Sequence, residues 1–362
     1  MPKRIDYIDI AKGIGILLVV MGHNDFATVS PLFYKIIYSF HMPLFFFISG
    51  MFFNKELSFA SLSKKRFQTL IKPYMAITLL IYFVTISFSK VNIDTATIRL
   101  IKTLYANSHY IDWGPLWFLP HLFALNIFTY FFYKTTKLIK IKNVEWIMLV
   151  VLQVLGVSVL RIFWPFNINL LGRIFTLFGL PLSTDIILVS GFFFILGSEV
   201  KKSIPDDFFD NPIILFGSGT IFFIMIFVFP QTINFDARFF ESLPINTIEA
   251  IMGIIFILAI SKKIALISKL TSVFRYIGNA SLIILIFHLP IQESFGEKFL
   301  HLFNNQIVSY WLAYFCGVVF PLLINIFLIR PNTIVRSWFG FPPIDTVQIK
   351  TIQAETNSNL LS

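Results

Sequence analysis

The residues best suited to chemistry lie in one apolar stretch near the start of the chain. Residues 8–23 read IDIAKGIGILLVVMGH and hold Asp9, Lys12 and His23. Lys12 and His23 are eleven residues apart, which on an α-helix places both side chains on one face, about 16 Å apart along the axis. Imidazole can take a proton from a hydroxyl group, or carry a transferred group, near neutral pH. Because such side chains inside an apolar helix usually face a wet cavity, the stretch predicts a helix that lines a reaction chamber.

Each of these residues also has a purely structural interpretation. His23 could hydrogen-bond to a neighbouring helix, and Asp9 and Lys12, at i and i+3, could form an ion pair at the helix end. Lys12 could also extend its ammonium group to the membrane interface. Gly13 and Gly15 favour the chamber, because they leave room for another group to approach the helix backbone closely.

The composition indicates an integral membrane protein. Of the 362 residues, 56% are hydrophobic, only 13% are charged and 45 are Phe, and the mean hydropathy is +0.78. Ordinary globular domains carry about 25% charged residues. We therefore expect one membrane domain over residues 1–340, followed by a short polar, disordered tail over residues 341–362. The single cysteine, Cys316, excludes an intrachain disulfide.

Ten apolar segments are long enough to cross a bilayer as helices, which takes about 20 residues each. They are residues 8–23, 32–53, 73–89, 115–133, 144–163, 184–200, 212–229, 245–261, 276–292 and 307–329. With the amino terminus in the cytoplasm, alternation places 21 of the 29 Lys and Arg residues on the cytoplasmic side, as the positive-inside rule requires. The predicted fold is all-α and polytopic, with about ten transmembrane helices and both termini cytoplasmic.

Two further expectations follow from this topology. The loop bias accounts for the net charge of +10, so we expect the lipid bilayer as a partner and no nucleic acid. Residues 167–183 are apolar but contain Gly172, Gly179 and Pro181. We expect them to form a short outer helix or a re-entrant piece rather than an eleventh span.

Five motifs, in this order, resemble the membrane-bound acyltransferase family 3. They are Lys12 and His23 separated by ten residues, FHMPLFFFISG at 40–50, KKRFQTLIKPY at 64–74, LWFLPHLF at 116–123 and IGNASLIILIFHLPI at 277–291. The wording around His41 is most similar to the branch that contains fucose 4-O-acetylases and O-antigen acetylases. The resemblance implies an enzyme that moves an acyl group, most often acetyl, from acetyl-CoA or another acyl-CoA onto a cell-surface polysaccharide.

The resemblance gives the residues of the first helix and of the basic loop their expected roles. His23 is the candidate catalytic residue, as base or as acyl carrier, and Asp9 beside Lys12 is the second. Lys12, Lys65, Arg66 and Lys72 are candidate ligands for the acyl-CoA phosphates. The Arg-x-x-Arg pair common in the family is absent, because Thr69 stands three residues after Arg66. The alternative for the basic loop is membrane orientation and attraction to anionic lipid.

Four more residues are candidates for binding the sugar acceptor. His41 precedes a helix-kinking Pro43, and His288 occupies the family's last motif. Trp117 and His121 are at i and i+4 on one helix face, where an aromatic ring could pack on a sugar. Each of the four could instead be a packed or interfacial side chain. No metal-binding or nucleotide-hydrolysing motif is present, so no metal cofactor is predicted.

The sequence thus predicts a multi-pass O-acyltransferase, with acetyl as the expected group, in what its Ile-, Lys-, Phe- and Asn-rich composition suggests is a bacterial inner membrane. The acceptor would be an O-antigen, a capsule or a lipid-linked sugar. The alternatives are a transporter or flippase for a lipid-linked saccharide, and a polysaccharide-synthesis subunit without chemistry. Transporters often contain inverted repeats with paired broken helices, and the sequence shows none. The sequence does not decide three points: which hydroxyl of the acceptor reacts, whether the acyl group is acetyl or succinyl, and whether His23 acts covalently or as a base.

Overall fold

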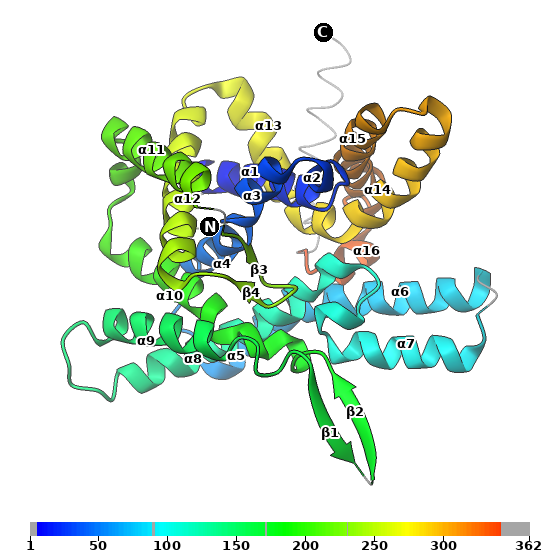
Figure 1. Cartoon of the computed structure of the whole chain (residues 1–362), viewed down its shortest axis with the longest axis horizontal. Helices are drawn as coiled ribbons and strands as arrows, with labels where there is room; N and C mark the ends of the chain where they lie inside the picture. Colours follow the sequence, from blue (N-terminus) through cyan, green and yellow to red (C-terminus); the bar gives the residue numbers. More distant parts are fainter. Residues whose placement is uncertain (1–5, 89–90, 171, 230, 342–362) are drawn as a thin grey trace.

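The computed structural model describes residues 6–88, 91–170, 172–229 and 231–341 as a mostly helical bundle (Figure 1). Its α-helices are α1 (Asp6–Gly22), α2 (Phe26–Val29), α3 (Pro31–Tyr38), α4 (His41–Met51), α5 (Phe59–Arg66), α6 (Lys72–Phe88), α7 (Ile93–Tyr105), α8 (Phe118–Thr136), α9 (Val144–Val159), α10 (Ile187–Ser203), α11 (Pro212–Val228), α12 (Leu243–Ile264), α13 (Ser268–Asn279), α14 (Ser281–Phe303), α15 (Gln306–Ile324) and α16 (Thr333–Trp338). The predicted tail, from residue 342 onward, lies outside the described residues.

Short helical turns and two small hairpins complete the described chain. The π-helical turns are η1 (Phe67–Ile71) and η6 (Asn325–Ile329), and the 3-10 turns are η2 (Ser108–Tyr110), η3 (Gly114–Trp117), η4 (Pro181–Ile186) and η5 (Asp206–Asp210). Strands β1 (Phe166–Leu170) and β2 (Arg173–Leu177) form one antiparallel hairpin, and β3 (Ile233–Asn234) and β4 (Phe239–Phe240) form the other.

The predicted membrane helices are present as helices. Six segments of the described chain are long and apolar enough to span a bilayer: Pro31–Met51, Phe59–Phe88, Gly114–Thr136, Pro181–Ser203, Leu243–Ile264 and Gln306–Ile329. The pair α13 and α14 makes a seventh if it is counted as one bent span, and α9 and α11 are apolar but shorter. A helical multi-pass membrane protein is confirmed, whereas the count of ten and the cytoplasmic side stay predictions.

Two segments differ from the helices expected there: the outer helix expected within residues 167–183 is wrong, whereas the re-entrant alternative stays a prediction, and the span expected at 276–292 is not continuous. Residues 167–183 do not start as a helix, because β1 and β2 pair around a turn in which Gly172 adopts a φ of 77°, open to glycine without steric cost. The predicted span 276–292 is broken near Ala280, where α13 meets α14 at 73°. The break lets α13 lie against α1, with Gly278 so close to the carbonyl of Asp9 that a Cβ would overlap it.

One end of the bundle, which we call the basic end, collects the start of α1 and the ends of α4, α8, α10 and α12. Lys55 after α4 pairs with Glu199 of α10 at 2.6 Å, and Tyr133 of α8 donates to the same carboxylate. Lys262 of α12 lies over the Tyr7 ring at the start of α1. Arg330, after α15, lies over Tyr276 of α13, so the described chain begins and ends at the basic end.

The opposite end, which we call the loop end, is fastened by one buried ion pair. Arg238 and Asp185 are both buried, and the guanidinium contacts the carboxylate through Nε at 2.6 Å and Nη2 at 3.2 Å. Arg238 also donates to Ser108 Oγ at 2.8 Å and lies over the ring of Trp164. This single side chain therefore joins the β3–β4 turn, η4, η2 and the segment after α9.

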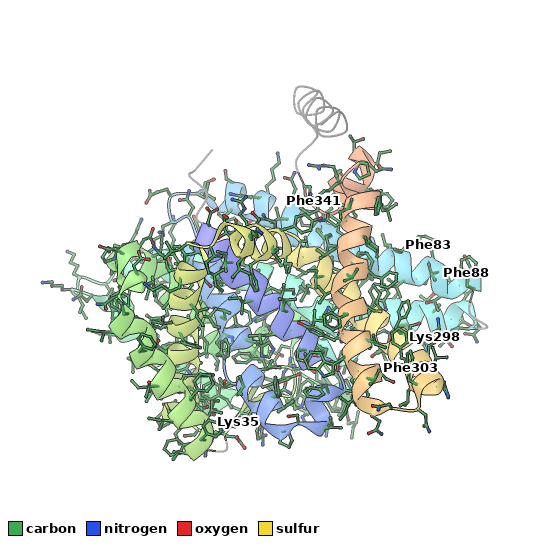
Figure 2. The ribbon with its side chains drawn as sticks, turned by 90° about the horizontal axis from the view of Figure 1, so that it is seen from above. Lys35, Phe83, Phe88, Lys298, Phe303 and Phe341 are labelled. Atoms are coloured by element: carbon green, nitrogen blue, oxygen red, sulfur yellow. The ribbon has the colours of Figure 1, made fainter. Side chains whose placement is uncertain are left out.

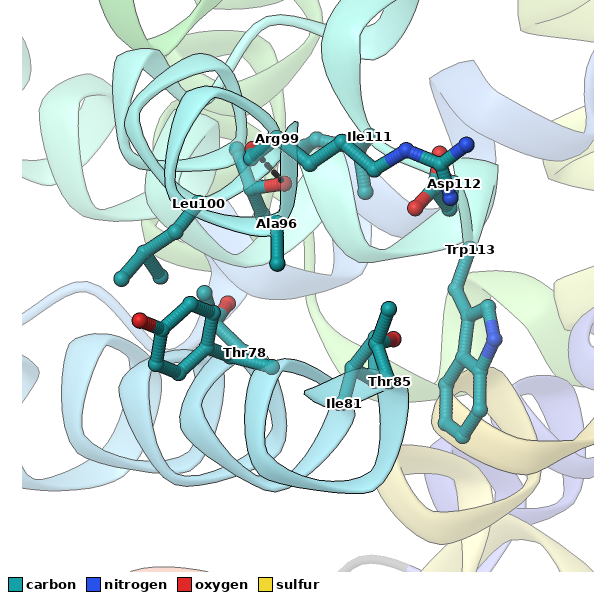
Figure 3. A pocket seen from close by; sticks show the side chains of 11 residues that line it. Thr78, Ile81, Thr85, Ala96, Arg99, Leu100, Ile111, Asp112 and Trp113 are labelled. Carbon is teal, nitrogen blue, oxygen red and sulfur yellow. Dashed lines mark hydrogen bonds between the residues drawn. The ribbon is translucent and has the colours of Figure 1, made fainter. Parts of the chain in front are cut away.

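Helices α6 and α7 form a hairpin that projects sideways from the bundle (Figures 1 and 2). Its outer surface is apolar, with Phe83 and Phe88 strongly exposed, whereas Tyr82 and Thr97 meet between the helices. A small cavity of about 20 Å³ lies there, enough for roughly one water molecule. Figure 3 shows Arg99 reaching across it toward Asp112. The hairpin turns polar groups inward and apolar groups outward, as a lipid-facing element should.

Candidate active site

Helix α1 is the central element of the site. It packs against α4, α12, α13, α14 and α15, and Ile8, Ile10 and Ala11 are fully buried. A Cβ at Gly13 would overlap the carbonyl of Phe274, and one at Gly15 would press on the Phe45 ring. The two glycines therefore admit neighbouring protein groups, α13 backbone and an α4 ring, to the surface of α1.

A pocket of about 210 Å³ runs along one face of α1. Lys12, Ile16 and Val19 line it from α1 at spacings of four and three residues, which is one helix face. The other lining residues come from α4 (Met42, Phe45, Ile48, Ser49), η1 (Thr69, Leu70), α8 (Phe118, Leu119, Leu122) and α14 (Ser281, Leu282, Leu285). Their polar groups cluster at the basic end, so the pocket has a polar mouth and an apolar body.

The far end of the pocket leads toward three histidines. Val19 lies one turn before His23 on the same face, Met42 follows His41, and Leu285 is three residues before His288. The His23 and His288 rings are 5.4 Å apart, and the charge of His23 acts on both His41 and His288. The structure thus brings His23 and His288 together, with His41 near enough for the charge of His23 to act on it.

Of the three, His23 is the accessible one. Its side chain is exposed, whereas His41 and His288 are buried. Neither ring nitrogen of His23 has a hydrogen-bond partner within the described part of the chain. Nδ1 of His41 contacts the Ile37 carbonyl at 2.7 Å and Nδ1 of His288 contacts that of Ile284 at 2.8 Å. His23 is therefore the ring that an incoming hydroxyl or acyl group can reach.

Two residues that sequence reasoning missed fix the position of His23. Asn24 donates to Gln292 Oε1 at 2.9 Å and to the Tyr310 carbonyl at 3.0 Å. Gln292 in turn donates to the Val20 carbonyl at 3.0 Å. This network holds the last turn of α1 against α14 and α15. The sequence offered two signals for this network. Asn24 is a polar residue directly after His23, and Gln292 is a polar residue in an apolar helix, four residues after His288.

Asp236 is the third residue that sequence reasoning missed. It lies in the β3–β4 turn next to Arg238, is exposed, and its charge acts on His23, Tyr38 and His109. Burial lowers the pKa of His109. The negative charge of Asp236 partly offsets this lowering, and the positive charge of Arg238 adds to it. The charge of the Asp236 carboxylate thus acts on His23 from the loop end, and only the fold of the turn reveals this.

Asp9 and Lys12 form the polar mouth of the pocket. Asp9 is buried and contacts Lys12 Nζ at 3.3 Å, and the same ammonium lies 4.7 Å from the centre of the Phe52 ring. Asp9 precedes His23 by fourteen residues, about 21 Å along the helix. It therefore orients Lys12, and it cannot touch a group that reacts at His23.

The predicted basic loop contributes unequally. Helix α5 continues through the π-helical η1 into α6, and the wide turn carries Thr69 and Leu70 into the pocket lining. Arg66, just before it, has a buried Nε without a hydrogen-bond partner among the described residues. Lys72 donates to Ser337 Oγ at 2.7 Å, whereas Lys65 is exposed. Arg66 thus lies three residues before the pocket-lining Thr69 and has a donor that no described residue uses.

Trp117 and His121 lie apart from the pocket. His121 is fully buried, with Nε2 2.9 Å from Ser190 Oγ and Nδ1 3.2 Å from the Leu182 carbonyl. Trp117 is buried and packs on His121, with ring centres 5.5 Å apart. Their arrangement favours a structural role at the start of α8 over contact with a sugar.

The fold and the site together define a multi-pass membrane protein with an accessible histidine one helical turn beyond an apolar pocket. Among the described residues, no three His, Cys, Asp or Glu side chains are arranged to hold a metal ion. The family model of the acyltransferase domain, acyltransferase family 3, matches residues 5–330. The chain therefore belongs to this family and is a membrane acyltransferase. No curated protein and no solved structure matches it significantly.

Proposed function

We propose that the protein is an O-acyltransferase that moves an acyl group, acetyl in the first instance, from acyl-CoA to a hydroxyl of a cell-surface polysaccharide or lipid-linked sugar. The observation that carries this proposal is the pocket that runs along one face of α1 from Lys12 to Val19, one helical turn before His23. The basic end would face the cytoplasm of a bacterial inner membrane, where acyl-CoA is available, and the loop end the acceptor. The resemblance around His41 favours the branch that contains fucose 4-O-acetylases.

The shape and polarity of the pocket suit an acyl-CoA. Lys12 and Arg66, whose Nε has no hydrogen-bond partner among the described residues, would hold the diphosphate at the polar mouth. There the Arg fork can bind two phosphate oxygens and Lys supplies a point charge. The pantetheine arm and the acyl group would follow the apolar body between α1, α4 and α14. The thioester then comes within reach of His23, and the apolar walls exclude water that would otherwise hydrolyse it.

His23 would perform the proton transfer. As the acceptor hydroxyl attacks the thioester carbonyl, an imidazole nitrogen takes the hydroxyl proton, the acyl–oxygen bond forms and the carbon–sulfur bond breaks. The proton then passes to the departing thiolate. In the covalent variant, a nitrogen of His23 attacks the thioester carbonyl first, and the carbon–sulfur bond breaks to release the CoA thiolate. The acceptor hydroxyl then attacks the acyl-imidazole, the acyl–nitrogen bond breaks, and the hydroxyl proton passes to the thiolate. Asp236, whose charge acts on His23, would stabilise the positive charge on the ring in both variants.

The test compares surface polysaccharide and purified protein from the same cells. We expect ester-linked acetyl to be lost in the null strain and in His23→Ala, with normal polymer yield and matched membrane levels, and retained in His301→Ala, an exposed histidine at the far end of α14. The purified wild type should consume acetyl-CoA in the presence of acceptor. Unchanged acetylation with reduced surface polymer would contradict the proposal and support a flippase.

A further inference from the structure

A second pocket, which we call the Tyr130 pocket, opens at the basic end between the α4–α5 connection and α8. It has a volume of about 530 Å³, and α5 packs beside α8 there (Figure 1). Its lining combines three aromatic rings, those of Phe53, Tyr130 and Tyr133, with three lysines, Lys55, Lys134 and Lys137. By contrast, the groove along α11 and α12 is lined by apolar residues and one threonine.

Two of the three lysines in the Tyr130 pocket form no ion pair with a carboxylate of the described chain. Lys55 is neutralised by the buried Glu199 at 2.6 Å, and it lies over the Tyr133 ring at 3.8 Å. Lys134 contacts only the face of the Tyr130 ring, at 5.6 Å. Neither Lys134 nor Lys137 pairs with a carboxylate within the described part of the chain, and both are exposed. The lining also contains one exposed carboxylate, that of Glu56, which pairs with neither lysine within the described residues. The rim therefore presents two lysines and one carboxylate, a net positive charge, above the aromatic rings, which we call the aromatic floor.

The aromatic floor is itself held in place. Tyr133 is buried and donates its hydroxyl hydrogen to Glu199 Oε1 at 2.6 Å, and its ring stacks on that of Phe53 at 5.8 Å. Tyr130 is packed by Phe59 of α5 at 5.6 Å. These partners fix the rings before a ligand binds. Binding of a flat aromatic ligand therefore costs little side-chain conformational entropy.

Two adjacent residues connect this pocket with the pocket on α1. The Phe52 ring meets Lys12 Nζ at the polar mouth of the α1 pocket. The ring of the next residue, Phe53, lies in the Tyr130 pocket against Tyr133. The Tyr130 pocket therefore lies near the polar mouth of the α1 pocket, on the side of residues 52 and 53, where a molecule that extends out past Lys12 could reach it.

We propose that the Tyr130 pocket binds the adenosine 3′-phosphate end of the acyl-CoA, with the adenine on the aromatic floor and the 3′-phosphate between Lys134 and Lys137. This inference rests on the proposed acyl-CoA donor. Adenine offers a flat π face to Tyr130 and Phe53, and stacking of bases on such rings is a general mode of nucleotide binding. Phosphate accepts charge-assisted hydrogen bonds from lysine. A lipid headgroup phosphate shares the second interaction but lacks the flat ring.

The experiment measures acyl transfer by purified protein in vesicles with three donors: acetyl-CoA, acetyl-3′-dephospho-CoA and S-acetyl-pantetheine. For the double variant Lys134→Ala and Lys137→Ala we expect KM for acetyl-CoA to rise about tenfold with unchanged kcat, since each charged hydrogen bond is removed from an exposed rim. KM for the other two donors should stay within about twofold. Tyr130→Ala should raise KM for both nucleotide donors and leave S-acetyl-pantetheine unaffected.

Lys140→Ala is the matched control, because Lys140 is an exposed lysine of the same connection that does not line the pocket. Equal losses with all three donors, or no change in KM, would overturn the proposal. Each assay is run in vesicles of phosphatidylcholine alone and of equal parts phosphatidylcholine and phosphatidylglycerol. An effect of the double variant that appears only with phosphatidylglycerol assigns the pocket to a lipid headgroup instead.

A wild type that consumes none of the three donors would refute the proposed function, and the pocket is then tested by binding alone. For this test, the dissociation constants of CoA and of 3′-dephospho-CoA are measured for the wild type and for the double variant and compared. A preference of the wild type for CoA that the double variant loses supports a nucleotide site. Equal binding of both ligands by both proteins rejects it.

Discussion

Two histidine regions of this protein, the end of α1 and the start of α8, carry the same residue type in different states. At the end of α1, His23 is exposed beside His288, whose Nε2 is buried without a hydrogen-bond partner. At the start of α8, both ring nitrogens of His121 have partners and the ring is fully buried. A buried ring whose nitrogens are satisfied stabilises a fold. An accessible ring with free nitrogens can exchange protons, so the first region is the one suited to chemistry.

The largest effect is expected when the accessible ring is removed. His23→Ala should lower kcat for acyl transfer by about 10²–10⁴-fold, the usual contribution of a general base, without lowering the amount of folded protein. Transfer assays at saturating acetyl-CoA, alongside size-exclusion profiles in detergent, check this. Full activity in His23→Ala would contradict the assignment of the catalytic histidine to the end of α1.

The buried ring should show the opposite pattern. His121→Phe keeps an aromatic ring but leaves Ser190 Oγ and the Leu182 carbonyl without their imidazole partner, which costs about 1–3 kcal/mol of stability. We expect a lower thermal midpoint and near-normal activity per folded molecule. A large rise in KM for the sugar acceptor, at unchanged midpoint, would instead return His121 to the acceptor site.

The network behind His23 gives a finer test. Gln292→Leu removes the contacts to Asn24 and to the Val20 carbonyl, so His23 should lose its fixed position and kcat should fall about tenfold, as misplacement of a catalytic group does. KM for acetyl-CoA should not change, because Lys12 and the pocket mouth are untouched. Gln153→Leu is a useful control, since Gln153 is a buried glutamine of α9 that contacts Thr247 on α12.

The smallest effect concerns the mouth of the α1 pocket. Lys12→Arg keeps the cation beside Asp9, and we expect KM for acetyl-CoA to stay within about threefold, whereas Lys12→Ala should raise it about tenfold. Neither change should affect kcat strongly, because Lys12 lies about 16 Å from His23 along the helix. Steady-state kinetics with acetyl-CoA as the varied substrate separates these outcomes.

Periodicity and hydropathy could predict the helices and one face of the site. The spacing of Lys12 and His23 placed them on one side of α1, and Ile16 and Val19 line the pocket between those positions. Apolar length alone could not locate the 73° bend near Ala280, because it depends on α13 packing against α1 through Gly278. The segment around Gly172 has the same apolar character as a helix, and only strand pairing distinguishes it.

Residues contributed by distant segments could not be predicted either. Asp236 reaches the histidine chamber only because Arg238 folds its turn onto Asp185 and Ser108. Lys134 and Lys137 read in sequence as an ordinary basic loop. Tyr130 precedes Lys134 by one turn of α8, but Phe53, which lines the same pocket, comes from the connection after α4. His121 matched the pattern of a substrate residue, yet Ser190, 69 positions later, occupies its Nε2.

The hairpin of α6 and α7 gives the protein an uneven outline (Figure 1). Its flanks carry exposed apolar residues such as Phe83 and Phe88, whereas the contact between Tyr82 and Thr97 lies between its two helices. Lipid chains can therefore surround the hairpin on several sides. This part of the protein depends on the bilayer, rather than on a buried core, to cover its apolar surface.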